Sequence, residues 1–484
     1  MNIYIKLKIT VFLSGFVLMV FELVGLRVLA PFLGSSSIVW TSVIGIILLF
    51  MSAGYWKGGK LADQYHATRV LGLILLGAAA SILVMNVSKN VVLVQLNSYS
   101  LPLITKSLLA CTLLFGAPSF LMAMVSPFAI RLSMDKKENS GSVAGGIYAF
   151  STLGSIVGTF LGGFVLISFL GTNLIIYLLS ILLFLLSLLF IVKEFHKIAL
   201  VVAFLVVGNG LQLTKSRNYI DIDTQYARVF IEHGNYKNQE TKFLLLDGYV
   251  NSGMAIAAPN KLLFEYTQFF DVLKYYHPQF DRVLLFGGGG FSYPKHFQEK
   301  FPSAHLDIVE IDGQLTQISQ EHFAFEKAMN TTIYNEDARY FLQKEHQAYD
   351  VVLYDVLTSP LSIPFHLTTQ ETFKEVSHIL MDDGVLILNL LGDLKGKSAR
   401  FIESEFLTLQ SVFPQVLIYS AQEKNVNGLH NYMMVAIKQK QEILNEHIPK
   451  TYQKLLAHPV TLKMEMNGFV LTDNFAPVDH LIGG

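Results

Sequence analysis

Charged residues are scarce in this sequence. Of its 484 residues, 15% are Asp, Glu, Lys or Arg and 52% are hydrophobic. Soluble domains carry about 25% charged residues, so the composition excludes an ordinary soluble protein. Cysteine is nearly absent as well, because Cys111 is the only one. A single cysteine excludes an intramolecular disulfide, and without a cysteine and histidine cluster we expect no metal site.

The few charges are distributed unevenly along the chain. Residues 1–213 hold 13 Lys and Arg against 5 Asp and Glu, a net charge of +8. The remaining residues hold 23 against 32, a net charge of −9. The first region therefore has the composition of a membrane protein and the second that of a mildly acidic soluble one. An acidic surface is poorly suited to phosphate backbones, so we expect no nucleic-acid partner.

Apolar stretches in the first region approach the ~20 residues that cross a bilayer as a helix. They cover residues 9–30, 38–56, 70–88, 103–126, 143–168, 172–192 and 197–213. We expect a polytopic helical domain over 1–213 with about seven spans and the lipid bilayer as its partner. Residues 90–97 are too short to span and are expected at the interface. Gly154, Gly158 and Gly162 recur every four residues, which predicts close helix packing, with a substrate path as the alternative.

Strands and helices alternate in the second region. Strands are predicted at 282–286, 305–311, 349–355 and 384–390, helices at 313–325, 369–380 and 398–413, and a closing hairpin at 416–421 and 432–438. This order predicts an α/β Rossmann-like domain with a doubly wound parallel sheet, of the class I methyltransferase type. An earlier hairpin at 226–233 and 241–247 predicts a small β subdomain. The expected domains are 1–213, 214–280, 281–440 and a C-terminal extension 441–484.

Candidate site residues follow the predicted strands, where open α/β sheets bind their ligands. Four glycines come directly after the first strand: Gly287, Gly288, Gly289 and Gly290. Glycines let the backbone approach a ligand closely. Glu310 comes 20 positions after Gly290, a spacing at which an acidic side chain accepts hydrogen bonds from ribose hydroxyls. Together they predict a nucleoside site.

Two further acids extend this site. Asp337 is placed to accept a hydrogen bond from an adenine amino group, and a helix N-cap is the alternative. Asp355 ends the strand YDVVLYD, at the edge of the sheet where packing does not require a carboxylate. We therefore predict that Asp355 acts in catalysis or amine binding.

These motifs resemble a known family. LLLDG (244–248), VLLFGGGG (283–290), VEID (309–312), EDARYF (336–341) and YDVVLYDV (349–356) are similar to those of spermidine synthases. In the first region, FELVGLRVLAPFLGSSSIVWTSVIG (21–45), GYWKGGKLAD (54–63), SPFAIRL (126–132) and YAFSTLGSIVGTFLGGFVL (148–166) resemble the membrane part of bacterial fused, multi-span spermidine synthase-like proteins. PFHLTTQETF (364–373) and LTDNFAPVDHL (471–481) resemble the same branch.

The resemblance implies a transferase with an S-adenosyl co-substrate and a polyamine acceptor such as putrescine. The donor would be decarboxylated S-adenosylmethionine, and methylthioadenosine would leave. Asp355 would be the catalytic residue. The donor site would comprise Gly287, Gly288, Gly289, Gly290, Glu310, Asp312, Asp337 and Ala338, and the amine site Asn251, Tyr266 and Thr358.

Two departures from the family pattern leave alternatives open. Soluble spermidine synthases carry GGGDGG, whereas this chain has Gly290 at the acidic position. They also carry DSSDP, whereas Thr358 replaces the second acid here. A lost contact to the donor's amine is compatible with ordinary S-adenosylmethionine and thus with a methyltransferase. A non-catalytic polyamine or nucleoside sensor or transporter is the other alternative, and a homodimer is left open.

Loop charges predict the orientation in the membrane. The side that holds the N-terminus carries 10 Lys and Arg and the opposite side 4, which places the N-terminus in the cytoplasm. Seven complete spans would then put the second region outside. Because adenosyl donors are cytoplasmic, we expect that region inside, at the bacterial inner membrane. This requires that 198–213 does not fully cross, or that an extra crossing lies near 90–97.

Overall fold

A computed structural model describes residues 3–134, 140–191, 219–344, 347–356, 363–395, 398–422, 430–440, 448–462 and 467–483. The chain divides into two compact units, Met1–Arg217 and Asn218–Gly484.

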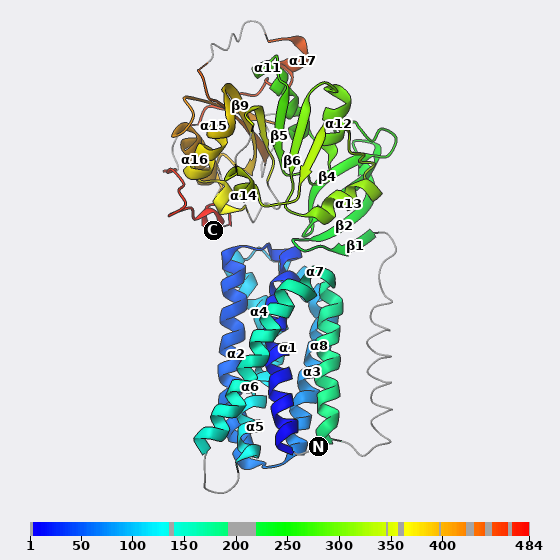
Figure 1. The fold of residues 1–484 in the computed structure, drawn as a ribbon, viewed down its shortest axis with the longest axis vertical. Helices are drawn as coiled ribbons and strands as arrows, with labels where there is room; N and C mark the ends of the chain where they lie inside the picture. The colour runs from blue at the N-terminus through cyan, green and yellow to red at the C-terminus, as the bar shows by residue number, and fades with distance from the viewer. Residues whose placement is uncertain are drawn as a thin grey trace. The chain divides into compact units, whose positions relative to one another are not determined.

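Long apolar helices build the first unit (Figure 1). They are α1 (Ile3–Leu33), α2 (Ser37–Gln64), α3 (Thr68–Asn97), α4 (Leu103–Ala123), α5 (Val125–Ser133), α6 (Ser140–Leu161), a π-helical turn (Gly162–Leu166), α7 (Ile167–Phe169) and α8 (Thr172–Ile191). Within the described residues, six stretches of these helices are long and apolar enough to cross a membrane. The expected polytopic helical fold is therefore confirmed, while the seventh predicted span, 197–213, lies outside the described residues.

Residues 90–97 are not the separate fragment that the sequence predicted. They continue α3 as one helix, so they add no crossing of their own. The charge at Lys89 that ends the apolar run in the sequence is buried in the helix bundle, with 3% of the residue exposed. Its Nζ donates a hydrogen bond of 2.8 Å to Oδ1 of Asn86 and a second one to Asn173 on α8. Because these two amides accept hydrogen bonds from the buried ammonium, α3 continues past Lys89 without a break.

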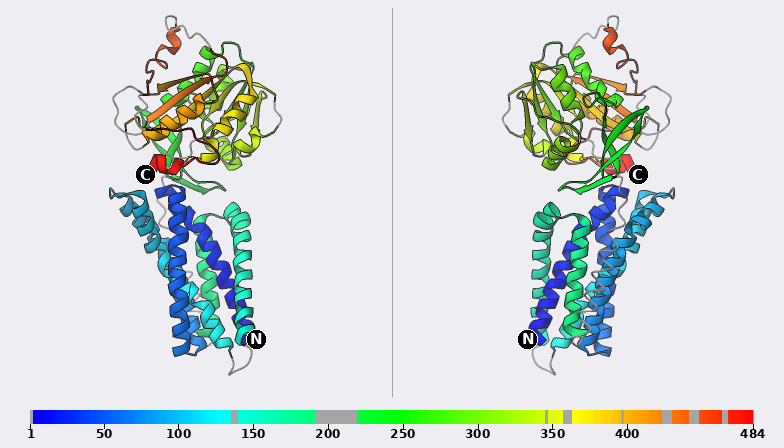
Figure 2. Two further views of the ribbon diagram at one scale, coloured as in Figure 1. Left: turned by 90° about the vertical axis from the view of Figure 1, so that its left-hand side faces the viewer. Right: turned by 90° about the vertical axis from the view of Figure 1, so that its right-hand side faces the viewer.

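The glycine stripe packs on α1, which lies side by side with α6 (Figure 2). A Cβ on Gly154 would lie 1.9 Å from the carbonyl oxygen of Phe12, and one on Gly158 would lie 2.5 Å from that of Phe16. From the side of α1, a Cβ on Gly15 would lie 2.3 Å from the carbonyl oxygen of Ser151 on α6. The two backbones are too close for any side chain, which is the close packing that small residues permit.

A four-stranded antiparallel sheet opens the second unit, with strands in the order β1-β2-β3-β4. The strands are β1 (Tyr219–Asp223), β2 (Arg228–Tyr236), β3 (Gln239–Leu246) and β4 (Tyr249–Ala255). The predicted hairpin is the central pair β2 and β3. Its turn has positive φ at Lys237 (48°) and Asn238 (62°), as the tight hairpin turns require. The sequence prediction missed β1 and β4, which flank this pair.

The predicted Rossmann-like sheet has seven strands in the order β10-β11-β9-β8-β5-β6-β7. They are β5 (Arg282–Phe286), β6 (His305–Val309), β7 (Thr331–Tyr334), β8 (Tyr349–Tyr354), β9 (Leu380–Gly392), β10 (Gln415–Ser420) and β11 (His430–Ile437). β5 to β9 pair in parallel, and β10 and β11 form the closing antiparallel hairpin. The doubly wound α/β fold is therefore confirmed.

Helices cover both faces of this sheet (Figure 1). They are α10 (Glu265–Phe269), a 3-10 turn (Phe270–Val272), α11 (Leu273–Tyr276), α12 (Ser292–Lys300), α13 (Gly313–His322), α14 (Ala338–Leu342), a 3-10 turn (Phe365–Leu367), α15 (Gln370–Ile379), α16 (Ala399–Gln410), α17 (Lys450–Gln453) and α18 (Val478–Gly483). Strand side chains alternate between two cores: Val283 faces α10 to α12, whereas Leu284 faces α14 to α16. Leu315 and Ile318 of α13 pack against the small sheet and fix it to the large one.

Candidate active site

The carboxyl ends of β5, β6 and β8 meet at one edge of the sheet, because β5 pairs in parallel with both of the others. Gly287, Glu310 and Asp355 each come directly after one of these strands. Backbone hydrogen bonds continue the pairing beyond the strands: Asp355 N–H donates to Phe286 O and Gly287 N–H to Val309 O, both at 2.9 Å. Three of the predicted site residues are thereby held next to one another.

The glycine loop after β5 requires glycine at two positions. Gly287 has φ of +89°, and a Cβ there would lie 2.0 Å from the carbonyl oxygen of Asp355. Gly289 has φ of +50°, and its Cβ would lie 2.5 Å from Oδ1 of Asn251 on β4. Side chains at these positions would be both strained and obstructed. The loop therefore brings its backbone close to Asp355 and Asn251.

Glu310 organises this loop. Its Oε2 accepts hydrogen bonds from the N–H groups of Gly288 (2.8 Å) and Gly289 (3.1 Å), and its Oε1 accepts one from Asp312 N–H (2.9 Å). Only 6% of the residue is exposed. Burial raises the pKa of Glu310, while these backbone hydrogen bonds lower it. Three of the four lone pairs of this carboxylate are therefore used, and the one left on Oε1 can accept a hydrogen bond from a ribose hydroxyl.

Asp312 and Asp337 are helix N-caps. Oδ1 of Asp312 accepts from Gln314 N–H at 3.1 Å at the start of α13. Oδ1 of Asp337 accepts from Arg339 N–H (2.8 Å) and Tyr340 N–H (3.1 Å) at the start of α14. The N-cap alternative for Asp337 is thus what the structure contains, and its Oδ2 lies 3.3 Å from Nε2 of His366.

Tyr226 lies near enough to these acids to feel their charge, and the sequence did not predict it. Burial raises the pKa of its phenol, and the negative charges of Asp312, Asp337 and Glu310 raise it further. Tyr226 lies in the β1–β2 connection, which contacts α13 where Gln225 N–H donates to the Gln314 side chain at 3.0 Å. No motif marks a lone tyrosine in a connection as a site residue.

Asp355 is held by the amide of Asn389, which Asn431 supports in turn, and the sequence predicted neither residue. Asn389 on β9 donates from Nδ2 to Oδ1 of Asp355 at 2.9 Å, and Asn431 on β11 donates to Oδ1 of Asn389 at 3.0 Å. Burial raises the pKa of Asp355 from 3.8 to about 6, and the hydrogen bond from Asn389 opposes the rise. The carboxylate is therefore fixed in orientation and titrates close to neutral pH. An asparagine within the apolar run LILNLLG was the available signal.

The predicted amine-site residues Tyr266 and Asn251 come together near Asp355. The Tyr266 hydroxyl donates to the backbone carbonyl of Asn251 at 3.2 Å. Burial raises the pKa of Tyr266 well above its ordinary value, and the charge of Asp355 adds to this. Ala338, which begins α14, is buried. Thr358 lies outside the described residues.

Gly290 occupies the place where the resemblance expects an acid. A Cβ there would lie 2.7 Å from both Cβ and Oγ of Ser252. Ser252 is fixed by a hydrogen bond of 2.9 Å between its Oγ and that of Ser292. An aspartate at this position would therefore require β4 or the glycine loop to shift.

The described residues contain no group of three or more His, Cys, Asp or Glu side chains that could hold a metal ion. The glycine loop after β5 and the acids after β6 and β8 lie at the carboxyl edge of the sheet, beside the point between β5 and β8 where the strand order reverses, which is the usual place for a ligand in sheets of this type.

Residues 267–447 match the family described as Spermine/spermidine synthase domain. The second unit therefore contains a spermine/spermidine synthase domain, and the resemblance predicted from the motifs is confirmed for it.

Several named proteins are similar to this chain. The polyamine aminopropyltransferase of Vibrio vulnificus (strain CMCP6) is 28% identical over 219 residues, covering 43% of this chain and 71% of that protein. The eEF1A lysine and N-terminal methyltransferase of Mus musculus is 29% identical over 145 residues, covering 28% of this chain and 20% of that protein. Among solved structures, a probable spermidine synthase from Corynebacterium glutamicum ATCC 13032 matches with a TM-score of 0.43 and 20% identity, covering 50% of this chain and 86% of that one.

Proposed function

We propose that this protein transfers an aminopropyl group from decarboxylated S-adenosylmethionine to a polyamine such as putrescine. The observation that carries the proposal is the Asp355 carboxylate, held by Asn389 beside the glycine loop that Glu310 organises. The matched domain and the aminopropyltransferase relatives support the same reaction.

The reaction is a direct displacement. The amine nitrogen attacks the methylene carbon beside the sulfonium sulfur, the carbon–sulfur bond breaks, and its electron pair stays on the sulfur of methylthioadenosine. The nitrogen must lose a proton, which Asp355 accepts. With a pKa raised to about 6, this carboxylate is mostly ionised at neutral pH and is a stronger base than an ordinary aspartate. Glu310 holds the ribose hydroxyls and Asp337 the adenine amino group.

A second candidate function is methyl transfer from S-adenosylmethionine. It is favoured by Gly290, where Ser252 leaves no room for the acid that would bind the donor's amine. The similarity to the mouse methyltransferase points the same way.

Products distinguish the two functions. Purified full-length protein in detergent is given decarboxylated S-adenosylmethionine or S-adenosylmethionine with a panel of polyamines, and the products are identified by mass spectrometry. Amine-dependent methylthioadenosine supports aminopropyl transfer. Adenosylhomocysteine formed from S-adenosylmethionine supports methyl transfer and contradicts the first proposal.

The membrane location is part of the proposal. The six long apolar helices support insertion into the bacterial inner membrane. We place the N-terminus and the catalytic unit in the cytoplasm, on the basis of the loop charges and of the cytoplasmic supply of donor. A reporter fused after residue 214 tests this: activity of a cytoplasmic reporter supports the placement, and activity of an external one contradicts it.

A further inference from the structure

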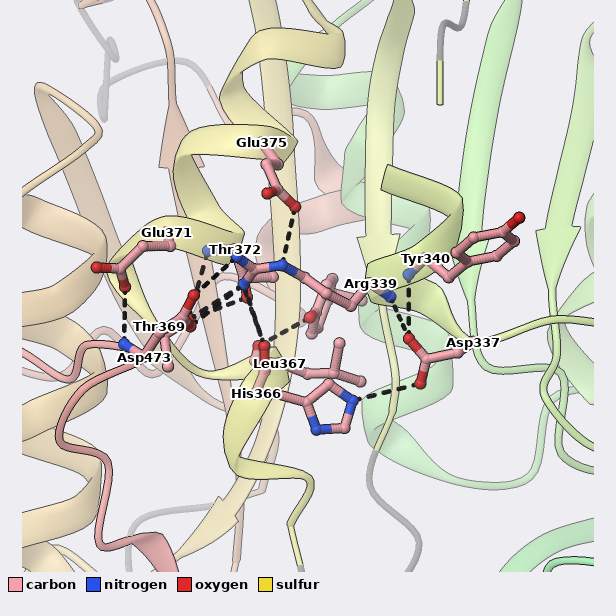
Figure 3. Close-up of polar contacts among 11 residues, drawn as sticks. Asp337, Arg339, Tyr340, His366, Leu367, Thr369, Glu371, Thr372, Glu375 and Asp473 are labelled. Atoms are coloured by element: carbon pink, nitrogen blue, oxygen red, sulfur yellow. Dashed lines mark hydrogen bonds and ion pairs between the residues drawn. The ribbon is translucent and has the colours of Figure 1, made fainter. Parts of the chain in front are cut away.

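Two sequence motifs that the reaction does not use meet in the structure. They are PFHLTTQETF (364–373), which leads into α15, and LTDNFAPVDHL (471–481), near the C-terminus. Thr369 Oγ1 donates to Oδ1 of Asp473 at 2.6 Å, and Gln370 N–H donates to the carbonyl of Leu471 at 2.8 Å. Asp473 N–H in turn donates to Oε2 of Glu371 at 2.9 Å. Figure 3 shows that both motifs gather around one arginine, Arg339 of α14.

The Arg339 guanidinium contacts three chain segments at once. Its Nη2 lies 3.0 Å from Oδ2 of Asp473, and its Nε lies 3.0 Å from Oε2 of Glu375. Its Nη1 donates to the carbonyl of His366 at 3.3 Å and to the Thr372 hydroxyl. The side chain is only 15% exposed. A planar fork with five donors can make all these contacts together, which a lysine cannot do.

These contacts bear directly on Asp337, the candidate adenine-binding acid. Oδ1 of Asp337 accepts from the N–H groups of Arg339 and Tyr340, and Oδ2 lies 3.3 Å from Nε2 of His366 (Figure 3). Arg339 belongs to α14, and its guanidinium also holds the backbone carbonyl of His366. It therefore fixes the groups on both sides of the Asp337 carboxylate.

The C-terminal segment reaches Arg339 in a defined register. Three successive contacts with α16 hold it: Gly468 N–H donates to Glu403 (3.1 Å), Phe469 N–H to Ser404 (3.2 Å) and Leu471 N–H to Thr408 (2.9 Å). Leu471 is fully buried in the core that α14 to α16 share. The segment lies outside the matched region 267–447. We call residues 467–475 the C-terminal strap.

We propose that Asp473 and Arg339 are positioning residues through which the C-terminal strap fixes Asp337 for nucleoside binding. This inference rests on the proposed function, because it assumes that Asp337 contacts the donor. Without the Asp473 carboxylate, the guanidinium loses a charged partner and the backbone of His366 loses its fixed support. The Asp337 carboxylate then samples more orientations, and ordering it again weakens donor binding.

The test is a thermodynamic cycle on nucleoside binding. Methylthioadenosine and adenosylhomocysteine are titrated calorimetrically into full-length protein in detergent. We expect Asp473→Asn to weaken binding about tenfold, the equivalent of ~1.4 kcal/mol. In an Asp337→Asn background the same change should weaken binding less than about twofold, because residues that act through one another are not additive. Arg339→Lys keeps the charge but not the fork, so we expect a loss similar to that of Asp473→Asn.

Asp382→Asn is the matched control, because it removes the same charge from a fully exposed side chain (102%) at the start of β9. Its binding should equal that of the wild type. Equal losses from Asp473→Asn in both backgrounds would show a merely structural role and overturn the inference. Undiminished binding in Arg339→Lys would overturn it as well. If the wild type binds neither nucleoside, the proposed function itself fails. If the wild type binds and Asp473→Asn binds equally well, only the inference about the C-terminal strap fails.

Discussion

Replacing Asp355 by asparagine should abolish turnover and stabilise the folded protein. Burial raises the pKa of Asp355 from 3.8 to about 6. At ~1.4 kcal/mol per pKa unit, this rise corresponds to about 3 kcal/mol. Because the folded-state pKa lies above the unfolded one, the associated stability is fully present below pH 3.8 and is lost as the pH rises through about 6. At neutral pH the unfolding free energy of the wild type should therefore be about 3 kcal/mol lower than that of the variant.

Urea titrations of the full-length protein in detergent at pH 4, 6 and 8, followed by near-ultraviolet circular dichroism, measure this difference. Asp355→Asn should match the wild type at pH 4 and exceed it by about 3 kcal/mol at pH 8. The exposed control Asp382→Asn should show no such trend. Equal stability of Asp355→Asn and wild type at pH 8 would refute the reasoning, because it would mean that the folded protein does not penalise the ionised carboxylate.

Four further outcomes are expected. The kcat/KM for transfer should rise with pH through an inflection near 6, as Asp355 ionises, and a flat profile of initial rates from pH 5 to 8 would contradict this. Asn389→Leu removes the amide that stabilises the ionised form, so the inflection should move up by about one pH unit in the same assay. Glu405→Gln should stabilise the protein at pH 8 but not at pH 4 in urea titrations. Glu405 is buried without a hydrogen-bond partner among the described residues, and burial raises its pKa well above 4.5, so its ionisation opposes folding. Gly154→Leu should lower the melting temperature in detergent, because its Cβ would meet a carbonyl at 1.9 Å, whereas Gly163→Leu, with open space around it, should not.

The sequence was sufficient to predict the features that follow from residue periodicity and from the order of strands and helices along the chain. Strands β5, β6 and β8 appear as short apolar runs, and in a parallel sheet the residues that follow them must share one edge. Gly287, Glu310 and Asp355 could therefore be placed together without coordinates. The small-residue period likewise predicted which face of α6 approaches another helix closely.

Features that depend on tertiary partners were not predictable in the same way. α3 continues through Lys89 because Asn86 and Asn173 satisfy its charge, and the distant Asn173 cannot be read from the local sequence. Asn389 and Asn431 become neighbours only through the pairing of β9 with β11. For Asp337 the sequence left ligand binding and N-capping open, and the structure shows one oxygen capping α14 and the other beside His366.

The C-terminal strap illustrates the same limit. Its motif could be recognised in the sequence, but its contacts with Arg339 join residues more than 130 positions apart. Only the packing of α14, α15 and α16 on one face of the sheet brings them together.

Aminopropyl transfer through Asp355 is tested by methylthioadenosine release from decarboxylated S-adenosylmethionine, with and without putrescine, by wild type and Asp355→Asn. Donor binding is measured on the same preparations. We expect putrescine-dependent release by the wild type, none by the variant, and donor binding by both. Equal release by Asp355→Asn, or donor binding without any amine-dependent release by the wild type, would contradict it.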